Sequence, residues 1–162
     1  MGSGPIVIGY DGTATAEQAL LQAAALMAPR QALVVVVWEP DRVFEVMAWP
    51  AATAGIPLAP LDIRAALEVQ QKEAERVQEL AARAADRARE AGLEADGLAV
   101  ADDRTVAETL VRIAREQDSR ALVIGARPHP SLGELVLGST ERDVVRTAPC
   151  AVLMVRGQDQ AG

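Results

Sequence analysis

The sequence predicts an α/β domain in which helices cover both faces of a mostly parallel sheet of five strands. Four short runs are apolar throughout and rich in Val and Ile, which is typical of strands that are buried on both faces. Segments with helical periodicity separate these runs, and such alternation with right-handed crossovers gives a three-layer, doubly wound sandwich. The four runs are residues 6–10, 32–38, 121–125 and 150–155.

A fifth strand is predicted over residues 93–101. Glu94 and Asp96 precede Leu98, Ala99 and Val100 in this segment. A central strand of such a sheet is covered by helices on both faces, where acidic side chains are seldom buried. We therefore expect this strand to lie at an edge of the sheet.

The first two predicted helices differ in length. In the first, small and apolar residues share one face, and either Thr13 or Thr15 is placed to cap the helix. The second, residues 62–91, carries a three–four repeat of mostly apolar residues and ends before Gly92. The first face comprises Ala16, Ala19, Leu20, Ala23 and Met27; the second comprises Leu67, Gln70, Ala74, Val77, Ala81, Ala84, Ala88 and Ala91.

Two further helices follow. Asp103 or Thr105 is placed to cap a third helix, which has Val106, Leu110 and Ile113 on one face. A fourth helix is predicted over residues 139–148 because a proline at position 149 stops it.

The connection over residues 39–61 is long for a compact domain. It contains four prolines together with Phe44, Met47 and Trp49. Long connections of this kind are commonly lids, contact surfaces or disordered segments. Because three large apolar side chains are costly to leave in water, we expect a flexible lid or a contact surface.

The length, net charge and cysteine count of the chain limit which kinds of function we expect. The chain of 162 residues has the length of one domain, so we expect a single domain over residues 1–162 with a short tail at 156–162. Its 16 basic and 23 acidic residues give a formal charge of −7, which disfavours nucleic-acid and membrane-surface partners. With one cysteine it has no intrachain disulfide, and residues 1–5 lack a secretory signal, so we expect a cytoplasmic protein.

A ligand site is predicted where the strand order reverses. In a sheet of order 3-2-1-4-5, strands one and four are neighbours, and ligands bind beyond their carboxyl ends. Asp11 follows the first strand, and Gly125 ends the fourth. The last helix opens at Gly138 and Ser139, where free backbone N–H groups favour anions. Ser139 can donate its hydroxyl to a phosphate or cap the helix instead.

Two segments resemble the universal stress protein family. Its signature is a glycine, a second glycine three positions later and, after nine more residues, a glycine followed by Ser or Thr. Residues 125–140 are similar to it, ending in Gly138, Ser139 and Thr140. Residues 6–13 are similar to the opening strand of the family, including Asp11.

The resemblance implies a fold of the adenine nucleotide α hydrolase type and a stress-response function. It further implies ATP or AMP, with or without Mg²⁺, at the strand-order reversal, and a homodimer paired through the last strand, Cys150 to Val155. Asp11 would serve the ribose and adenine, and Val37 would line the adenine pocket. The residues implied in binding are Asp11, Val37, Gly125, Arg127, Gly138, Ser139 and Thr140.

The chain departs from the signature at the second glycine, where Pro128 stands. Proline has no backbone N–H and fixes φ near −65°, so a donor for phosphate is lost. A missing charge-assisted bond costs about 1.5–3 kcal/mol. The alternative is therefore a signalling or interaction protein of the same fold that binds no nucleotide.

Catalytic motifs are absent from the sequence. Lys72 is the only lysine and lies in the long predicted helix, so no phosphate-loop Gly-Lys-Ser/Thr triplet occurs. His129 either contacts a phosphate or is an exposed loop residue. Asp102 and Asp103 either end a loop and cap a helix or hold Mg²⁺. We expect a weak ATPase activity at most.

Overall fold

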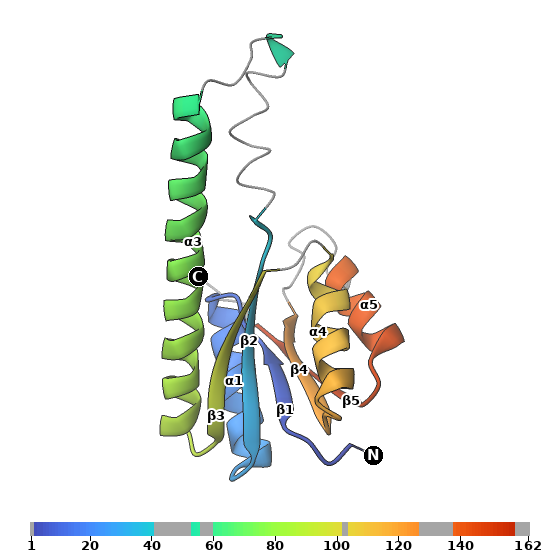
Figure 1. Ribbon diagram of the computed structural model, residues 1–162. Coiled ribbons are helices and arrows are strands. Elements are labelled where there is room, and N and C mark those ends of the chain that lie inside the picture. Colours follow the sequence, from blue (N-terminus) through green and yellow to red (C-terminus); the bar gives the residue numbers. More distant parts are fainter. Residues whose placement is uncertain (1, 41–52, 56–59, 102–103, 127–137, 158–162) are drawn as a thin grey trace, which may run out of the picture.

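The computed structural model describes residues 2–40, 53–55, 60–101, 104–126 and 138–157 (Figure 1). Strands and helices alternate along the chain, as the sequence predicts. The strands are β1 (Ile6–Gly9), β2 (Gln31–Trp38), β3 (Glu94–Ala101), β4 (Ala121–Ala126) and β5 (Ala151–Arg156). The helices are α1 (Ala14–Met27), α3 (Pro60–Glu90), α4 (Val106–Glu116) and α5 (Ser139–Thr147).

The five strands form one sheet of order β3-β2-β1-β4-β5, and each pair of neighbours is parallel. This confirms the predicted order. It places β3, with its acidic residues, at one edge and β5 at the other. β1 pairs with both β2 and β4, so the strand order reverses between β1 and β4.

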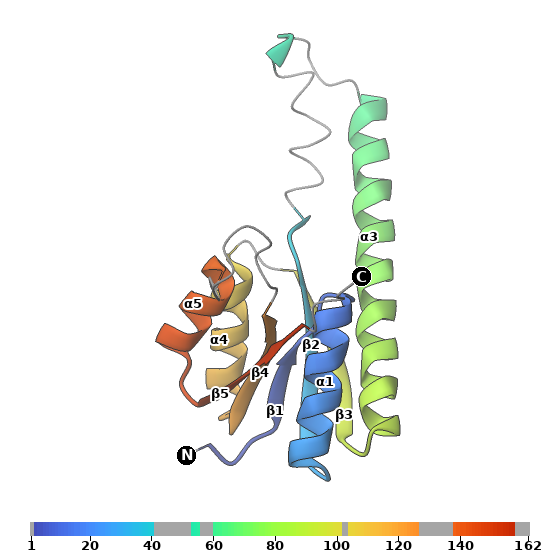
Figure 2. The same ribbon diagram turned by 180° about the vertical axis from the view of Figure 1, so that it is seen from behind.

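Helices cover both faces of the sheet. α1 and α3 lie on one face, and α4 and α5 lie on the other (Figures 1 and 2). Successive side chains of a strand point to opposite faces. Accordingly, Ile6 and Ile8 pack in the cluster that contains α1, whereas Val7 packs against α4. Burial on both faces therefore explains the apolar runs of β1, β2 and β4. It does not explain the run of β5, an edge strand in which no residue is fully buried.

Threonines cap two of the helices. The Thr13 hydroxyl accepts a hydrogen bond from the Ala16 N–H at 3.2 Å, so Thr13, and not Thr15, caps α1. At α4 the cap is Thr105, whose hydroxyl accepts from the Glu108 N–H at 3.2 Å. The Glu108 carboxylate accepts in return from the Thr105 N–H at 3.1 Å, which completes a capping box.

α3 is longer than the sheet that it covers. From Val77 to Ala88 its predicted apolar face is buried against β2 and β3. Toward its N-terminus the helix extends beyond the sheet (Figure 1), and Leu67 is 54% exposed. The prediction that Leu67 belongs to the buried face is therefore wrong, because the helical period continues where the sheet has ended.

Among the helices within the described ranges, none combines the length and apolar character that crossing a membrane requires.

The first strand ends at Gly9, one residue earlier than predicted. Tyr10 follows it and still donates its N–H to the Val35 carbonyl of β2 at 2.9 Å. Most of the connection over residues 39–61, including Phe44, Met47 and Trp49, lies outside the described residues.

Candidate ligand-binding site

A cavity of about 390 Å³ opens beyond the carboxyl ends of β1 and β4. It lies where the strand order reverses, as predicted. Six of the seven predicted site residues line it, and the seventh, Arg127, is outside the described residues. The six are Asp11, Val37, Gly125, Gly138, Ser139 and Thr140.

The lining divides into an apolar part and a polar part. Val35 and Val37 of β2, Leu110 of α4 and Ile124 of β4 contribute aliphatic surface. Polar groups come from the segment that follows β1 and from the first turn of α5. A volume of this size, with mostly apolar walls and a few convergent polar groups, is typical of small-molecule sites.

Asp11 is oriented by the turn that follows β1. One carboxylate oxygen of Asp11 accepts hydrogen bonds from the Thr13 N–H at 3.0 Å and the Thr13 hydroxyl at 2.6 Å. Between them, Gly12 has a φ of 80°, a conformation that glycine adopts without strain. The turn therefore fixes the carboxylate at the cavity through the residue that also caps α1.

Gly125 allows β4 to approach the start of α1. A Cβ at position 125 would lie 2.8 Å from the Thr15 Cγ2 and 3.0 Å from the Thr15 carbonyl carbon. Backbone atoms cannot yield as a flexible side chain can. The glycine at this position thus has a packing role, whatever its role toward a ligand.

The N-terminus of α5 forms one side of the cavity. Its N-cap is Gly138, without a side-chain hydrogen bond, and Ser139 is the first helical residue. The alternative in which Ser139 caps the helix is therefore wrong. The N–H groups of the first turn have no partner within the helix, which leaves donors at this side.

Sequence reasoning missed Glu141, which also lines the cavity. Its carboxylate lies so close to Gly138 that a side chain at position 138 would collide with it. Glu141 stands three residues after the N-cap, the position at which Glu commonly folds back toward a helix start. That spacing was the one available signal.

Tyr10 also lines the cavity, and a chain of polar contacts leads from it toward α3. The Tyr10 hydroxyl donates to the Glu17 carboxylate at 3.1 Å, and Arg87 of α3 donates to the same carboxylate at 2.8 Å. Burial, followed by the hydrogen bond to Glu17, raises the pKa of Tyr10. Tyr10 is therefore a neutral donor at physiological pH.

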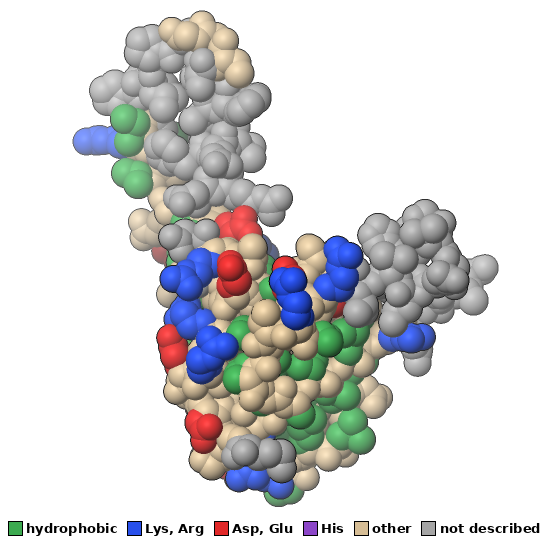
Figure 3. Space-filling view, turned by 90° about the vertical axis from the view of Figure 1, so that its right-hand side faces the viewer, with side chains coloured by type: hydrophobic (Ala, Val, Ile, Leu, Met, Phe, Trp, Pro, Cys, Tyr) green, Lys and Arg blue, Asp and Glu red, His purple; other side chains and the backbone are tan. Residues whose placement is uncertain are grey.

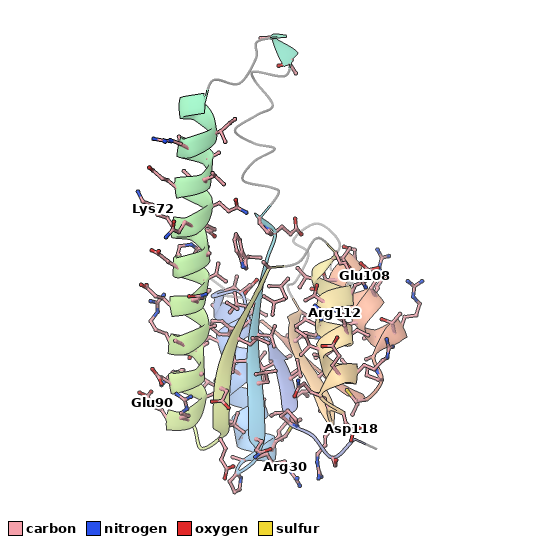
Figure 4. All side chains as sticks on the ribbon, in the orientation of Figure 1. Arg30, Lys72, Glu90, Glu108, Arg112 and Asp118 are labelled. Carbon is pink, nitrogen blue, oxygen red and sulfur yellow. The ribbon has the colours of Figure 1, made fainter. Side chains whose placement is uncertain are left out.

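The other residues that the sequence analysis considered for a chemical role lie away from the cavity or outside the residues that the structure describes. Lys72 is exposed on α3 and points away from the sheet (Figure 4). Cys150 is half-buried before β5, and burial raises the pKa of its thiol, which disfavours the reactive thiolate. Four of these considered residues lie outside the part of the chain that the structure describes: Asp102, Asp103, Pro128 and His129.

The family model described as the universal stress protein family matches residues 3–156. This chain belongs to that family. The match covers nearly the whole length, including every strand of the sheet and the segments around the cavity. No curated protein sequence matches the chain significantly.

Solved structures agree with the universal stress protein fold. The hypothetical protein MJ0577 has a TM-score of 0.71 at 18% identity, covering 99% of this chain and 100% of that one. The universal stress protein from Archaeoglobus fulgidus has a TM-score of 0.64 at 25% identity, covering 94% and 98%. A structure of the Archaeoglobus fulgidus protein in complex with dAMP has a TM-score of 0.56 at 23% identity, covering 96% and 99%.

Proposed function

We propose that this universal stress protein binds an adenine nucleotide, ATP or AMP, in the cavity between β1, β4 and α5. The observation that carries the proposal is that six residues from four separate segments meet around one cavity. The Val, Leu and Ile side chains of the lining offer a surface for a planar base, and the first turn of α5 offers N–H donors for a phosphate.

Each part of the nucleotide has a counterpart in the cavity. The aliphatic side chain of Val37, at the end of β2, suits the adenine ring. The Asp11 carboxylate can accept hydrogen bonds from ribose hydroxyls. Gly138 and Ser139 lie where a phosphate would reach α5. Structures of related family members in complex with dAMP and with cAMP lend support.

Filling the cavity tests the proposal. Val37→Phe places a larger side chain in the cavity, so we expect AMP affinity, measured by titration calorimetry, to fall by about tenfold or more. Val100 is the matched control because it lies opposite Val37 in the pairing of β2 with β3 and does not line the cavity. Val100→Phe should keep AMP affinity within about twofold.

Two results would contradict the proposal. One is the absence of saturable binding of adenosine, AMP and ATP to the folded wild-type protein. The other is an unchanged AMP affinity in Val37→Phe. The first result would favour the alternative of an interaction protein that binds no nucleotide.

We further propose that two copies pair through β5 and that the protein acts in the cytoplasm as a stress-response module. β5 is an edge strand, and an unpaired apolar edge is prone to pair with another strand. Beside it, Leu21 and Leu26 of α1 line a groove together with Leu153. Hydrophobic side chains are exposed across the middle of this side of the molecule (Figure 3).

A charge at this edge tests the pairing. Leu153→Lys introduces an ammonium group, so we expect a monomer at a concentration at which the wild type sediments as a dimer. Val145→Lys is the control, because Val145 is 52% exposed on α5 and lies outside the groove. A wild-type monomer, or a dimer in Leu153→Lys with an unchanged circular dichroism spectrum, would contradict the proposal.

A further inference from the structure

We infer that Glu141 is a specificity-determining residue that makes the cavity select adenosine and AMP over ATP. The inference rests on the proposed function and concerns the charge of its ligand. The first observation is that all the charged side chains described in the lining of the cavity are negative. Two carboxylates, Asp11 and Glu141, line the cavity, and the described lining residues include no Lys, Arg or His.

Glu141 lies where a phosphate would have to bind. Glu141 is half-buried in the first turn of α5, and its carboxylate lies against Gly138. A negative group at a helix N-terminus is stabilised by the helix dipole and by the N–H groups of the first turn. The side chain therefore occupies, within the same chain, the position that favours an anion.

The two carboxylates have different consequences for a nucleotide. Asp11 is held by Thr13 after β1, where it can accept hydrogen bonds from a neutral sugar. Glu141 faces the phosphate end. Like charges in a partly buried site repel more strongly than in water, because the surrounding protein screens them less. The repulsion increases with each phosphate added to the nucleoside.

This repulsion predicts an order of affinities. Adenosine carries no charge, so the Glu141 carboxylate does not repel it. AMP has one phosphate, which must displace or approach the carboxylate. ATP has three and meets the largest penalty. The described lining thus favours a nucleoside or nucleoside monophosphate over a triphosphate.

Glu141→Gln removes the charge while keeping the size of the side chain. Glutamine has a helix propensity close to that of glutamate, so α5 should persist. By calorimetry without Mg²⁺, we expect ATP affinity to rise by about tenfold or more and AMP affinity by a few-fold. Adenosine affinity should stay within about twofold.

Asp143→Asn is the matched control. It removes the same charge from the same helix, but Asp143 does not line the cavity and pairs with Arg146 at 2.9 Å. We expect the ratio of ATP to adenosine affinity to remain as in the wild type. An equal rise in ATP affinity in both variants would point to net charge alone and would overturn the role assigned to Glu141.

The titrations are repeated with Mg²⁺ because a carboxylate beside phosphates can hold the ion instead of repelling them. Three results would overturn the inference while leaving nucleotide binding intact: an unchanged ATP to adenosine ratio in Glu141→Gln, tighter binding of ATP than of AMP by the wild type, or a loss of Mg²⁺-ATP affinity in Glu141→Gln. Absence of binding of all three compounds to both proteins would instead overturn the proposed function, and this inference with it.

Discussion

Leu20→Ala lowers the free energy of unfolding by about 2–5 kcal/mol. Leu20 is fully buried in α1, in the cluster that joins this helix to Ile6 and Ile8 of β1 and to α3. The substitution removes buried methyl groups and leaves a cavity between helix and sheet, and the surrounding side chains close it only in part. Urea unfolding followed by circular dichroism measures the change, and the m-value should stay constant.

Leu26→Ala is the control for this prediction, and both variants are measured in the monomeric Leu153→Lys background because Leu26 lines the groove beside β5. It makes the same chemical change in the same helix, but Leu26 is 67% exposed. We therefore expect a change within about 0.5 kcal/mol. Equal losses in the two variants would mean that α1 is stabilised by its helix propensity and not by packing on the sheet.

Gly97→Thr is expected to destabilise the domain by about 1–3 kcal/mol. A Cβ at position 97 of β3 would collide with the backbone carbonyl of Ala81 in α3. No rotamer relieves this contact, because the Cβ itself collides with a backbone oxygen. Either β3 or α3 must shift, and the burial of Ala81 and Val77 against the sheet is then reduced.

Asp96→Thr provides the comparison, since it places the same residue one position earlier on the same edge strand. The side chain of Asp96 is 88% exposed, and its 3.4 Å contact with Arg89 is a surface ion pair. Such pairs contribute between zero and about 1 kcal/mol. If urea unfolding showed equal stability for Gly97→Thr and Asp96→Thr, the close approach of α3 to β3 would be refuted.

Local patterns were sufficient to predict the sheet. Runs such as residues 121–125 are apolar on both faces, and only a strand covered on both sides has that requirement. Glu94 and Asp96 then assigned β3 to an edge, because burial of both carboxylates would be costly. The strand order 3-2-1-4-5 was predicted as a common arrangement of five such strands, and the meeting of Asp11 and Gly125 followed from that order.

The sequence could not decide which of two neighbouring threonines caps α1 or how far the buried face of α3 extends. Thr13 and Thr15 have equal capping chemistry, and only the turn at Gly12 places Thr13 at the helix start. Leu67 continues the apolar period of α3, yet the sheet ends before reaching it. Periodicity records which face of a helix can be buried, and the length of the partner element decides how much of it is buried.

By itself, the sequence determined the order of strands and helices along the chain and the position of β3 at an edge of the sheet, and it predicted the end of the sheet at which the cavity lies. These properties depend on periods and caps within short segments. The tertiary structure alone decided that Glu141 lines the cavity and that α3 lies directly against Gly97. Both depend on how complete elements pack together, which no pattern within a single segment specifies.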